Sequence, residues 1–294
     1  MRVIAVGVDR RGDADEAVRW GATLADRTAS ELHLVHAVER NGSPDPWTLA
    51  DQRVLEQAQQ VAQSVGPTLV IRHQLSWQSL QETLTSATRT ADVLVVGARQ
   101  GGRTLRPGGV PVGTLIARAA SCPVVVVPRG WAASVAGHAR GGGYGVVVCD
   151  DGSNRSTAVL QAAVGLARGT DATLTVVHCP PGVGPARSDA DPPASALPEA
   201  GEPVRRLTEV VQRIQDRNPD LHIRSGSFRG TSPSTDVLAA AADADIVVLG
   251  GRGVAESGSD PFGDTIDAVL DAAELPVMIV PLESRSPFGA ALVA

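Results

Sequence analysis

The chain carries one pattern of apolar strands and amphipathic helices twice, and this internal repeat constrains its fold more than any other feature. The Val-rich strand candidates are Val3–Val8, Leu32–Val38, Thr68–Leu75, Val93–Gly97 and Val124–Val127, then Tyr144–Cys149, Ala172–His178, Leu221–Ser227, Ile246–Gly250 and Val277–Val280. Asp9 matches Asp151 at an offset of 142, and Gly97 matches Gly250 at an offset of 153. The two offsets differ because the second copy carries a Pro-, Ala- and Asp-rich stretch from Pro180 to Pro203. The chain therefore consists of two copies of one domain.

Amphipathic segments with a helical period alternate with these strands. They are Asp13–Thr28, Thr48–Gln63, Trp77–Thr90 and Val112–Ala120, then Asn154–Gly169, Pro203–Arg217, Ser234–Ala242 and Gly263–Ala273. Gly169 has the place of a residue that ends a helix. Short, continuously apolar strands that alternate with helices are typical of a parallel sheet covered on both faces. Because crossovers are right-handed, we predict two tandem doubly wound α/β domains of the Rossmann-like type, each with a five-stranded parallel sheet.

The repeat also predicts the domain boundaries. We expect the first domain over residues 1–130, a Gly-rich linker over 131–143, the second domain over 144–283 and a tail over 284–294. The final Val-rich strand of each copy would be a sheet edge in an isolated domain. In a tandem chain these two strands can pair with each other, which predicts an intramolecular pseudo-dimer; a further homodimer stays open.

Composition excludes several partners and chemistries. The net charge of −6 argues against nucleic acid and acidic membranes, which both need a basic surface. The chain contains no Lys, so Schiff-base chemistry and a P-loop lysine are excluded. The apolar run Val3–Val8 is too short for a signal peptide or a membrane span. Cys122, Cys149 and Cys179 lack metal-ligand spacing, so we expect no metal site but reduced, mostly buried thiols in a cytoplasmic protein.

Residues that directly follow strands are the first candidates for a binding site, because ligands of doubly wound sheets bind at the carboxyl ends of the strands. Asp9 and Asp151 follow the first strand of each copy, and Gly152 follows Asp151. Such an acid accepts a hydrogen bond from an adenine amino group or a ribose hydroxyl. Asp and Gly are also common where a helix begins after a strand, so a capping role stays open.

A second candidate follows the fourth strand of the second copy, where the chain reads GGRGVAESGSDPFGDT. Gly250, Gly253 and Gly263 have a Gly-x2-Gly-x9-Gly spacing, Arg252 lies between the first two, and Thr265 stands close behind the third. Glycines let the backbone approach a phosphate closely, and Gly263 is expected to open a helix whose free N–H groups favour an anion. The loop therefore has the features of a phosphate site.

Together these patterns resemble the universal stress protein family, of the tandem-domain, actinobacterial type, over nearly the whole chain. Asp151-Gly152-Ser153 is similar to the Asp-Gly-Ser that closes the first strand in that family, and His36 and His178 match the His that commonly ends its second strand. Cys122-Pro123 precedes a run of valines, as in the final strand of the family. The resemblance implies an adenine-nucleotide-hydrolase-like fold and a site for ATP with Mg²⁺.

The resemblance places that site in the second copy. The residues that it implies as nucleotide contacts are Asp151, Gly152, Cys179, Gly250, Arg252, Gly253, Gly263, Asp264 and Thr265. In the first copy, Gln100, Val110 and Pro111 occupy the places of the second glycine, the third glycine and the hydroxyl residue. Pro111 has no N–H to donate to a phosphate. The first copy is therefore not expected to bind a triphosphate by the family's mode.

Asp264 departs from the family pattern, because it stands where a Ser or Thr is expected. A carboxylate about 4 Å from a phosphate oxygen repels it by roughly 1–4 kcal/mol. Mg²⁺ between Asp264 and the phosphates would reverse this effect. Thr265 takes the hydroxyl's role only if the helix starts one residue later, and Asp264 can equally be a helix cap. We therefore expect ATP binding that Asp264 weakens.

Two functions stay open after this comparison. One is a non-enzymatic stress-response module that binds adenine nucleotide through the second copy; the other is a scaffold of the same fold that acts through protein–protein contacts. A dehydrogenase is disfavoured because neither first turn has Gly-x-Gly-x-x-Gly, and a serine hydrolase because Gly-x-Ser-x-Gly is absent. No catalytic residues are predicted, and His36 and His178 are expected to be buried histidines with satisfied hydrogen bonds.

Overall fold

Strands and helices alternate along the chain in the computed structural model, which describes residues 2–10, 14–38, 49–98, 112–131, 144–150, 156–178, 202–227, 232–251 and 261–281. The first half contains β1 (Val3–Val8), α1 (Asp15–Arg27), β2 (Glu31–Ala37), α2 (Leu49–Val65), β3 (Ile71–Ser76), α3 (Leu80–Ala87), β4 (Val93–Gly97), α4 (Val112–Ala119) and β5 (Val124–Val127). The second half contains β6 (Gly145–Asp150), α6 (Ser156–Thr170), β7 (Thr173–His178), α7 (Glu202–Arg217), β8 (Ile223–Ser227), α8 (Pro233–Ala240), β9 (Ile246–Gly250), α9 (Pro261–Ala272) and β10 (Val277–Val280).

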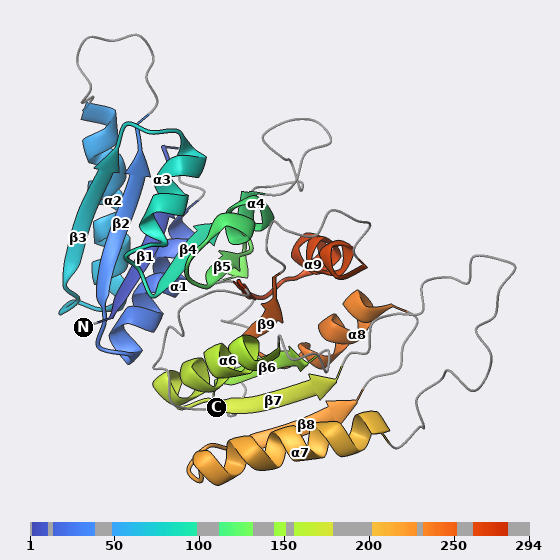
Figure 1. Cartoon of the computed structure of the whole chain (residues 1–294). Helices are drawn as coiled ribbons and strands as arrows, with labels where there is room; N and C mark the ends of the chain where they lie inside the picture. The colour runs from blue at the N-terminus through green and yellow to red at the C-terminus, as the bar shows by residue number, and fades with distance from the viewer. Residues whose placement is uncertain are drawn as a thin grey trace, which may run out of the picture.

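The strands form one ten-stranded sheet in the order β3-β2-β1-β4-β5-β10-β9-β6-β7-β8 (Figure 1). Within each half all neighbouring strands are parallel. In the first half the chain adds β2 and β3 on one side of β1 and then β4 and β5 on the other side. In the second half it adds β7 and β8 on one side of β6 and then β9 and β10 on the other, so each sheet has a topological switch point beside its first strand. This is the doubly wound α/β fold that the sequence predicts, present twice.

The two halves meet at their final strands. β5 and β10 pair in antiparallel orientation, with Val125 opposite Met278, and every residue of both strands is buried. The pairing covers the two apolar edges that isolated halves would expose. The expected pairing of the final strands within one chain is therefore present.

Helices cover both faces of this sheet and close two apolar cores. Because the strands are buried on both sides, successive residues alternate between the cores: Val6 belongs to one cluster and Ala5 to the other. The first core includes buried residues of α1, α2, α6 and α7, and the second includes residues of α3, α4, α8 and α9. Each core contains residues of both halves, so the halves share their interior as well as their sheet.

The helix ends differ from the predicted ones where local capping decides them. The helix expected over Trp77–Thr90 is shorter, because Ser79 caps α3: its hydroxyl accepts the Glu82 N–H at 3.3 Å, and the Glu82 carboxylate accepts the Ser79 N–H at 3.1 Å. Gly169 does not end α6, which continues to Thr170. After α6 it is Asp171 that adopts a positive φ, of 53°, a conformation that Gly, Asn and Asp adopt most readily.

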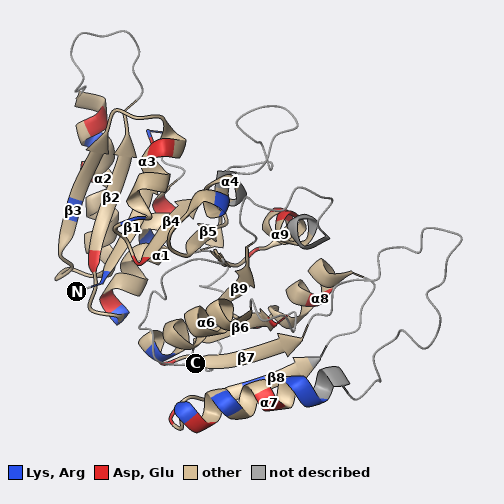
Figure 2. Ribbon diagram, in the orientation of Figure 1, with Lys and Arg blue, Asp and Glu red and all other residues tan. Residues whose placement is uncertain are grey.

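Most charged residues lie on the helices and in the connections between elements, whereas β4, β5 and β9 near the centre of the sheet carry none (Figure 2). Both signs of charge alternate along α7, so that helix presents no surface of a single sign (Figure 2). Among the described residues, no helix combines the length and the hydropathy that a membrane span requires.

Side chains outside the sheet add to the contact between the halves. The Arg27 guanidinium, at the end of α1, donates from Nη1 to the Thr170 carbonyl of α6 at 3.3 Å and lies 5.0 Å from the centroid of the Tyr144 ring. Burial raises the pKa of the Tyr144 hydroxyl above its usual range, so the ring stays neutral. Trp131 and Tyr144 both pack against the first core; in the sequence, Trp131 directly precedes residues 132–143 and Tyr144 directly follows them.

Replacing Arg27 tests whether this contact couples the halves. We expect Arg27→Ala to lower the free energy of unfolding by about 1 kcal/mol, because it removes one hydrogen bond and one cation–π contact. The measurement is urea unfolding followed by circular dichroism. Arg19→Ala is the matched control, since Arg19 is exposed on the same helix, and its effect should stay within about 0.5 kcal/mol. Equal effects of the two substitutions would contradict the coupling.

Candidate functional site

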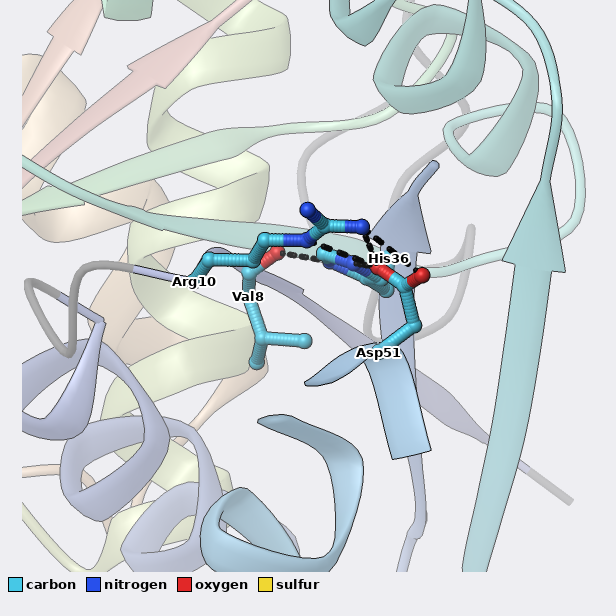
Figure 3. Close-up of polar contacts among 4 residues, drawn as sticks. All are labelled: Val8, Arg10, His36 and Asp51. Carbon is cyan, nitrogen blue, oxygen red and sulfur yellow. Dashed lines mark hydrogen bonds and ion pairs between the residues drawn. The ribbon is translucent and has the colours of Figure 1, made fainter. Parts of the chain in front are cut away.

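The carboxyl ends of β1 and β2 hold a buried histidine whose two ring nitrogens are both engaged. His36, next to the last residue of β2, is 2% exposed. Its Nδ1 lies 3.0 Å from the Val8 carbonyl oxygen, and its Nε2 lies 2.8 Å from Oδ1 of Asp51 (Figure 3). His36 therefore connects the end of β1 to the first turn of α2.

Asp51 is fully buried in α2 and also binds Arg10, which follows β1. Arg10 donates from Nε to Oδ1 at 2.9 Å and from Nη2 to Oδ2 at 2.8 Å, a bidentate ion pair (Figure 3). Its side chain is 33% exposed, so the guanidinium lies at the border between the interior and solvent. We refer to Arg10, Asp51 and His36 as the Arg–Asp–His cluster.

The acceptors in this cluster determine where its protons lie. The Val8 carbonyl can only accept, so Nδ1 of His36 carries a hydrogen. Asp51 is a carboxylate because Arg10 binds both of its oxygens, so Nε2 donates to it as well. With both nitrogens donating, His36 has no lone pair for proton abstraction. This confirms the prediction that His36 is a buried, satisfied histidine.

In the second half, His178 repeats one of these two hydrogen bonds. His178 ends β7, is 7% exposed, and donates from Nδ1 to the Asp150 carbonyl at 3.0 Å. The register is the same in the two halves, because Val8 pairs with His36 and Asp150 pairs with His178. The predicted burial of His178 is therefore confirmed, whereas of its two ring nitrogens only Nδ1 has a hydrogen bond among the described residues.

At the sequence positions that correspond to Asp51 and Arg10, the second half carries other residues. The apolar faces of α2 and α7 match at an offset of 152: the buried pairs are Leu55 and Leu207, Ala58 and Val210, and Ala62 and Ile214. The same offset relates β3 to β8, which pair with β2 and β7 in matching register. It places Pro203 at the position of Asp51, and the offset of 142 places Gly152 in the sequence at the position of Arg10.

Several of the predicted site residues lie outside the described residues. These are Asp151, Gly152, Cys179, Arg252 and Gly253.

The remaining predicted residues lie where β9 ends and α9 begins. Gly250 is the last residue of β9, and Gly263, Asp264 and Thr265 all lie within α9. This helix begins at Pro261, two residues before the predicted start, so Gly263 is its third residue instead of its first. N–H groups of the first turn of a helix, that of Gly263 among them, have no acceptor within the helix. Thr265 is 8% exposed, in the second turn.

Gly250 has a packing role that is independent of any ligand. A Cβ atom at this position would lie 2.9 Å from Cγ2 of Val159 on α6, which is too close for a real contact. The close approach of α6 to the end of β9 therefore requires a glycine here. Phosphate binding remains a prediction for Gly250, next to this structural explanation.

The sequence analysis did not identify Arg10 and Asp51 as functional residues. One available signal was the position of Asp51. It lies at helical spacing from Leu55, Ala58 and Ala62 and therefore on the same buried face of α2. An acid on such a face is buried and needs a cation. A second signal was Arg10, which stands where the family pattern has Gly after the strand-end Asp.

The described thiols do not provide a nucleophile. Burial raises the pKa of the Cys122 thiol to about 12, so this residue, 1% exposed, is protonated at neutral pH. Cys149 is also buried, and it forms no disulfide. Among the residues that the structure describes, no group of three His, Cys, Asp or Glu side chains could hold a metal ion.

Comparison with known proteins identifies the family. The family model described as "Universal stress protein family" matches residues 1–128 and 145–281. The chain belongs to the universal stress protein family. A universal stress protein of Mycolicibacterium smegmatis is 29% identical over 292 residues, which cover 94% of this chain and 96% of that protein. A universal stress protein of Mycobacterium tuberculosis is 26% identical over 295 residues, with coverage of 94% and 96%.

Solved structures of universal stress proteins share the tandem fold. A universal stress protein from Archaeoglobus fulgidus has a TM-score of 0.58 at 14% identity and covers 95% of this chain and 96% of its own. A putative universal stress protein from Pseudomonas aeruginosa has a TM-score of 0.57 at 21% identity, with coverage of 96% and 93%. The resemblance predicted from the sequence motifs is thereby confirmed, while the domain boundaries near residues 130 and 143 remain predictions.

Removing the buried acid of the cluster should destabilise this universal stress protein strongly. Asp51→Ala leaves His36 and Arg10 without their carboxylate, and we expect the free energy of unfolding to fall by about 3 kcal/mol. Guanidinium unfolding measures this loss. Glu56→Ala removes an exposed acid from the same helix and should change stability by less than about 0.5 kcal/mol. A loss for Asp51→Ala as small as that of the control would show that the cluster does not stabilise the fold.

The buried thiol gives a second, independent check. Cys122 should resist alkylation by iodoacetamide in the folded protein at pH 8, because only the thiolate reacts and the pKa is about 12. In guanidinium the same residue should be labelled completely. Peptide mass spectrometry distinguishes the two states, and rapid labelling of Cys122 in the folded protein would contradict its burial.

Proposed function

We propose that this universal stress protein is a non-enzymatic, cytoplasmic stress-response module that binds adenine nucleotide, ATP with Mg²⁺, in its second half only. The observation that supports this proposal is that the two halves carry different residues at the carboxyl ends of their strands. Ligands of doubly wound sheets enter where the strand order reverses, which is beside β1 in the first half and beside β6 in the second.

In the first half, the Arg–Asp–His cluster occupies this edge. Arg10 follows β1, and its ion pair with Asp51 spans the ends of β1 and β2. A nucleoside at this place would have to displace a buried ion pair, and breaking such a pair costs about 3–5 kcal/mol. The first half also lacks the second and third glycines and the hydroxyl residue of the phosphate loop. Both features argue against a nucleotide there.

In the second half, Pro203 replaces the acid, and the glycines of the phosphate loop are kept. The first turn of α9 has N–H groups without an acceptor inside the helix, which suit the phosphates. Asp264 is an oxygen ligand of the kind that Mg²⁺ prefers, and Mg²⁺ would supply the charge that neutralises the phosphates. Without the ion, the Asp264 carboxylate opposes them.

A scaffold without any nucleotide is the second candidate function. Two observations favour it: Asp264 replaces the expected hydroxyl residue, and the packing of Val159 explains Gly250 without a ligand. Nucleotide binding separates the two candidates directly, since a scaffold would bind no ATP under any condition.

Calorimetric titration with ATP and Mg²⁺ tests the proposal. We expect micromolar binding that Gly253→Asp abolishes, because a side chain and a negative charge would enter the phosphate loop. Gly101→Asp in the first half is the matched control and should leave the affinity unchanged. Absence of binding by the unaltered protein, with and without Mg²⁺, would favour the scaffold.

The effect of Asp264 needs its own substitution. Asp264→Ser should tighten ATP binding about tenfold or more in the absence of Mg²⁺, because it removes roughly 1–4 kcal/mol of repulsion. With Mg²⁺ the gain should shrink, since the carboxylate then contacts the ion. The same titration measures both conditions, and an unchanged affinity in both would show that Asp264 does not face the phosphates.

A further inference from the structure

We propose that Nε2 of His178 accepts a hydrogen bond from a donor group of the nucleoside, either the adenine amino group or a ribose hydroxyl. This inference rests on the proposed function of the second half and assigns a recognition role to a residue that family motifs leave structural. It arises from a difference between two positions that are otherwise equivalent in the fold.

The two histidines are held in the same way at Nδ1. His36 donates to the Val8 carbonyl at 3.0 Å, and His178 donates to the Asp150 carbonyl at 3.0 Å. Since a carbonyl only accepts, the proton of His178 is fixed at Nδ1. A ring that keeps this one proton has its lone pair at Nε2. Because the strand register is the same in both halves, Nε2 of His178 faces the position in the second half that is equivalent to Asp51 in the first.

The two histidines differ at Nε2. His36 meets Oδ1 of Asp51 at 2.8 Å, whereas His178 has no second hydrogen bond within the described part of the chain. The residue at the corresponding helix position is Pro203, which carries neither a carboxylate nor a side-chain donor. His178 is nevertheless 7% exposed. Nε2 of His178 is not among the fully buried polar atoms that lack a partner, so solvent reaches it, and a ligand that supplies a donor can replace that water.

The position of His178 fits the nucleoside and not the phosphates. The phosphate loop follows β9, and β6 lies between β9 and β7 in the sheet. Neighbouring strands are about 4.8 Å apart, so the end of β7 lies roughly 10 Å from the end of β9. That separation matches a nucleotide whose phosphates lie at β9 and α9 and whose base or sugar reaches over β6 to His178.

His178→Asn provides a selective test. The side-chain amide of Asn can take the place of Nδ1 and keep the hydrogen bond to Asp150, but it has no atom at the place of Nε2. We expect ATP affinity to fall about tenfold by calorimetry, while the thermal unfolding midpoint without ligand stays close to that of the unaltered protein. His222→Asn makes the same change at an exposed position just before β8 and should leave the affinity unchanged.

Nucleotide analogues identify the donor. Purine riboside triphosphate lacks the amino group, and 2′-deoxy-ATP and 3′-deoxy-ATP each lack one hydroxyl. The analogue that lacks the donor should bind the unaltered protein about tenfold more weakly than ATP, yet bind the His178→Asn protein as well as ATP does. This non-additive pattern would not arise if His178 had only a structural role.

The outcomes separate the inference from the function on which it rests. If the unaltered protein binds no ATP, the proposed function fails and the inference fails with it. If it binds ATP and a folded His178→Asn protein binds equally well, only the inference is overturned. It is also overturned if every analogue loses the same affinity in both proteins.

Discussion

The antiparallel pairing of β5 with β10 is the interaction on which the rest of the structure depends. Each half alone is a parallel sheet that ends in a four-residue, fully buried Val-rich strand, so neither half could leave that edge in water. Antiparallel pairing of equivalent strands relates the halves by an approximate two-fold axis. Because all strands within a half are parallel, the carboxyl ends of the two halves then point to opposite edges of the sheet. The two candidate sites are thus kept apart.

Because the two sites are separate, the polar residues near the strand ends can differ between the halves while the fold of the halves stays the same. The apolar positions of α2 and α7 are shared because each core needs them, whereas Asp51 and Pro203 at the same helix position serve different surroundings. In the first half a carboxylate of the protein itself satisfies the strand-end histidine. A closed site in the first half imposes nothing on the second, because the carboxyl ends of the strands of the two halves point in opposite directions.

The sequence predicts the strands well, because the apolar residues that form them must be buried on both faces, and β1, β4, β5, β9 and β10 have the predicted bounds. Helix ends are predicted less well, since α3 begins where the reciprocal hydrogen bonds of Ser79 and Glu82 fix it. The ion pair of Arg10 with Asp51 joins residues 41 positions apart and depends on how α2 packs, which no local pattern encodes. The predicted contacts of five residues lie outside the described residues and stay predictions: Asp151, Gly152, Cys179, Arg252 and Gly253.

The glycines that first suggest a phosphate site are weaker support for function than the histidine is. Gly250 is required by the approach of Val159, so selection for packing alone would preserve it in a chain that binds nothing. Among the described residues, Nε2 of His178 lacks the partner that its equivalent in His36 has, and packing explains Gly250 but not this difference. If the second site had simply decayed, an apolar residue at the position of His178 would be the more stable choice, because it has no polar atom to satisfy. The retained imidazole therefore favours a ligand in the second half.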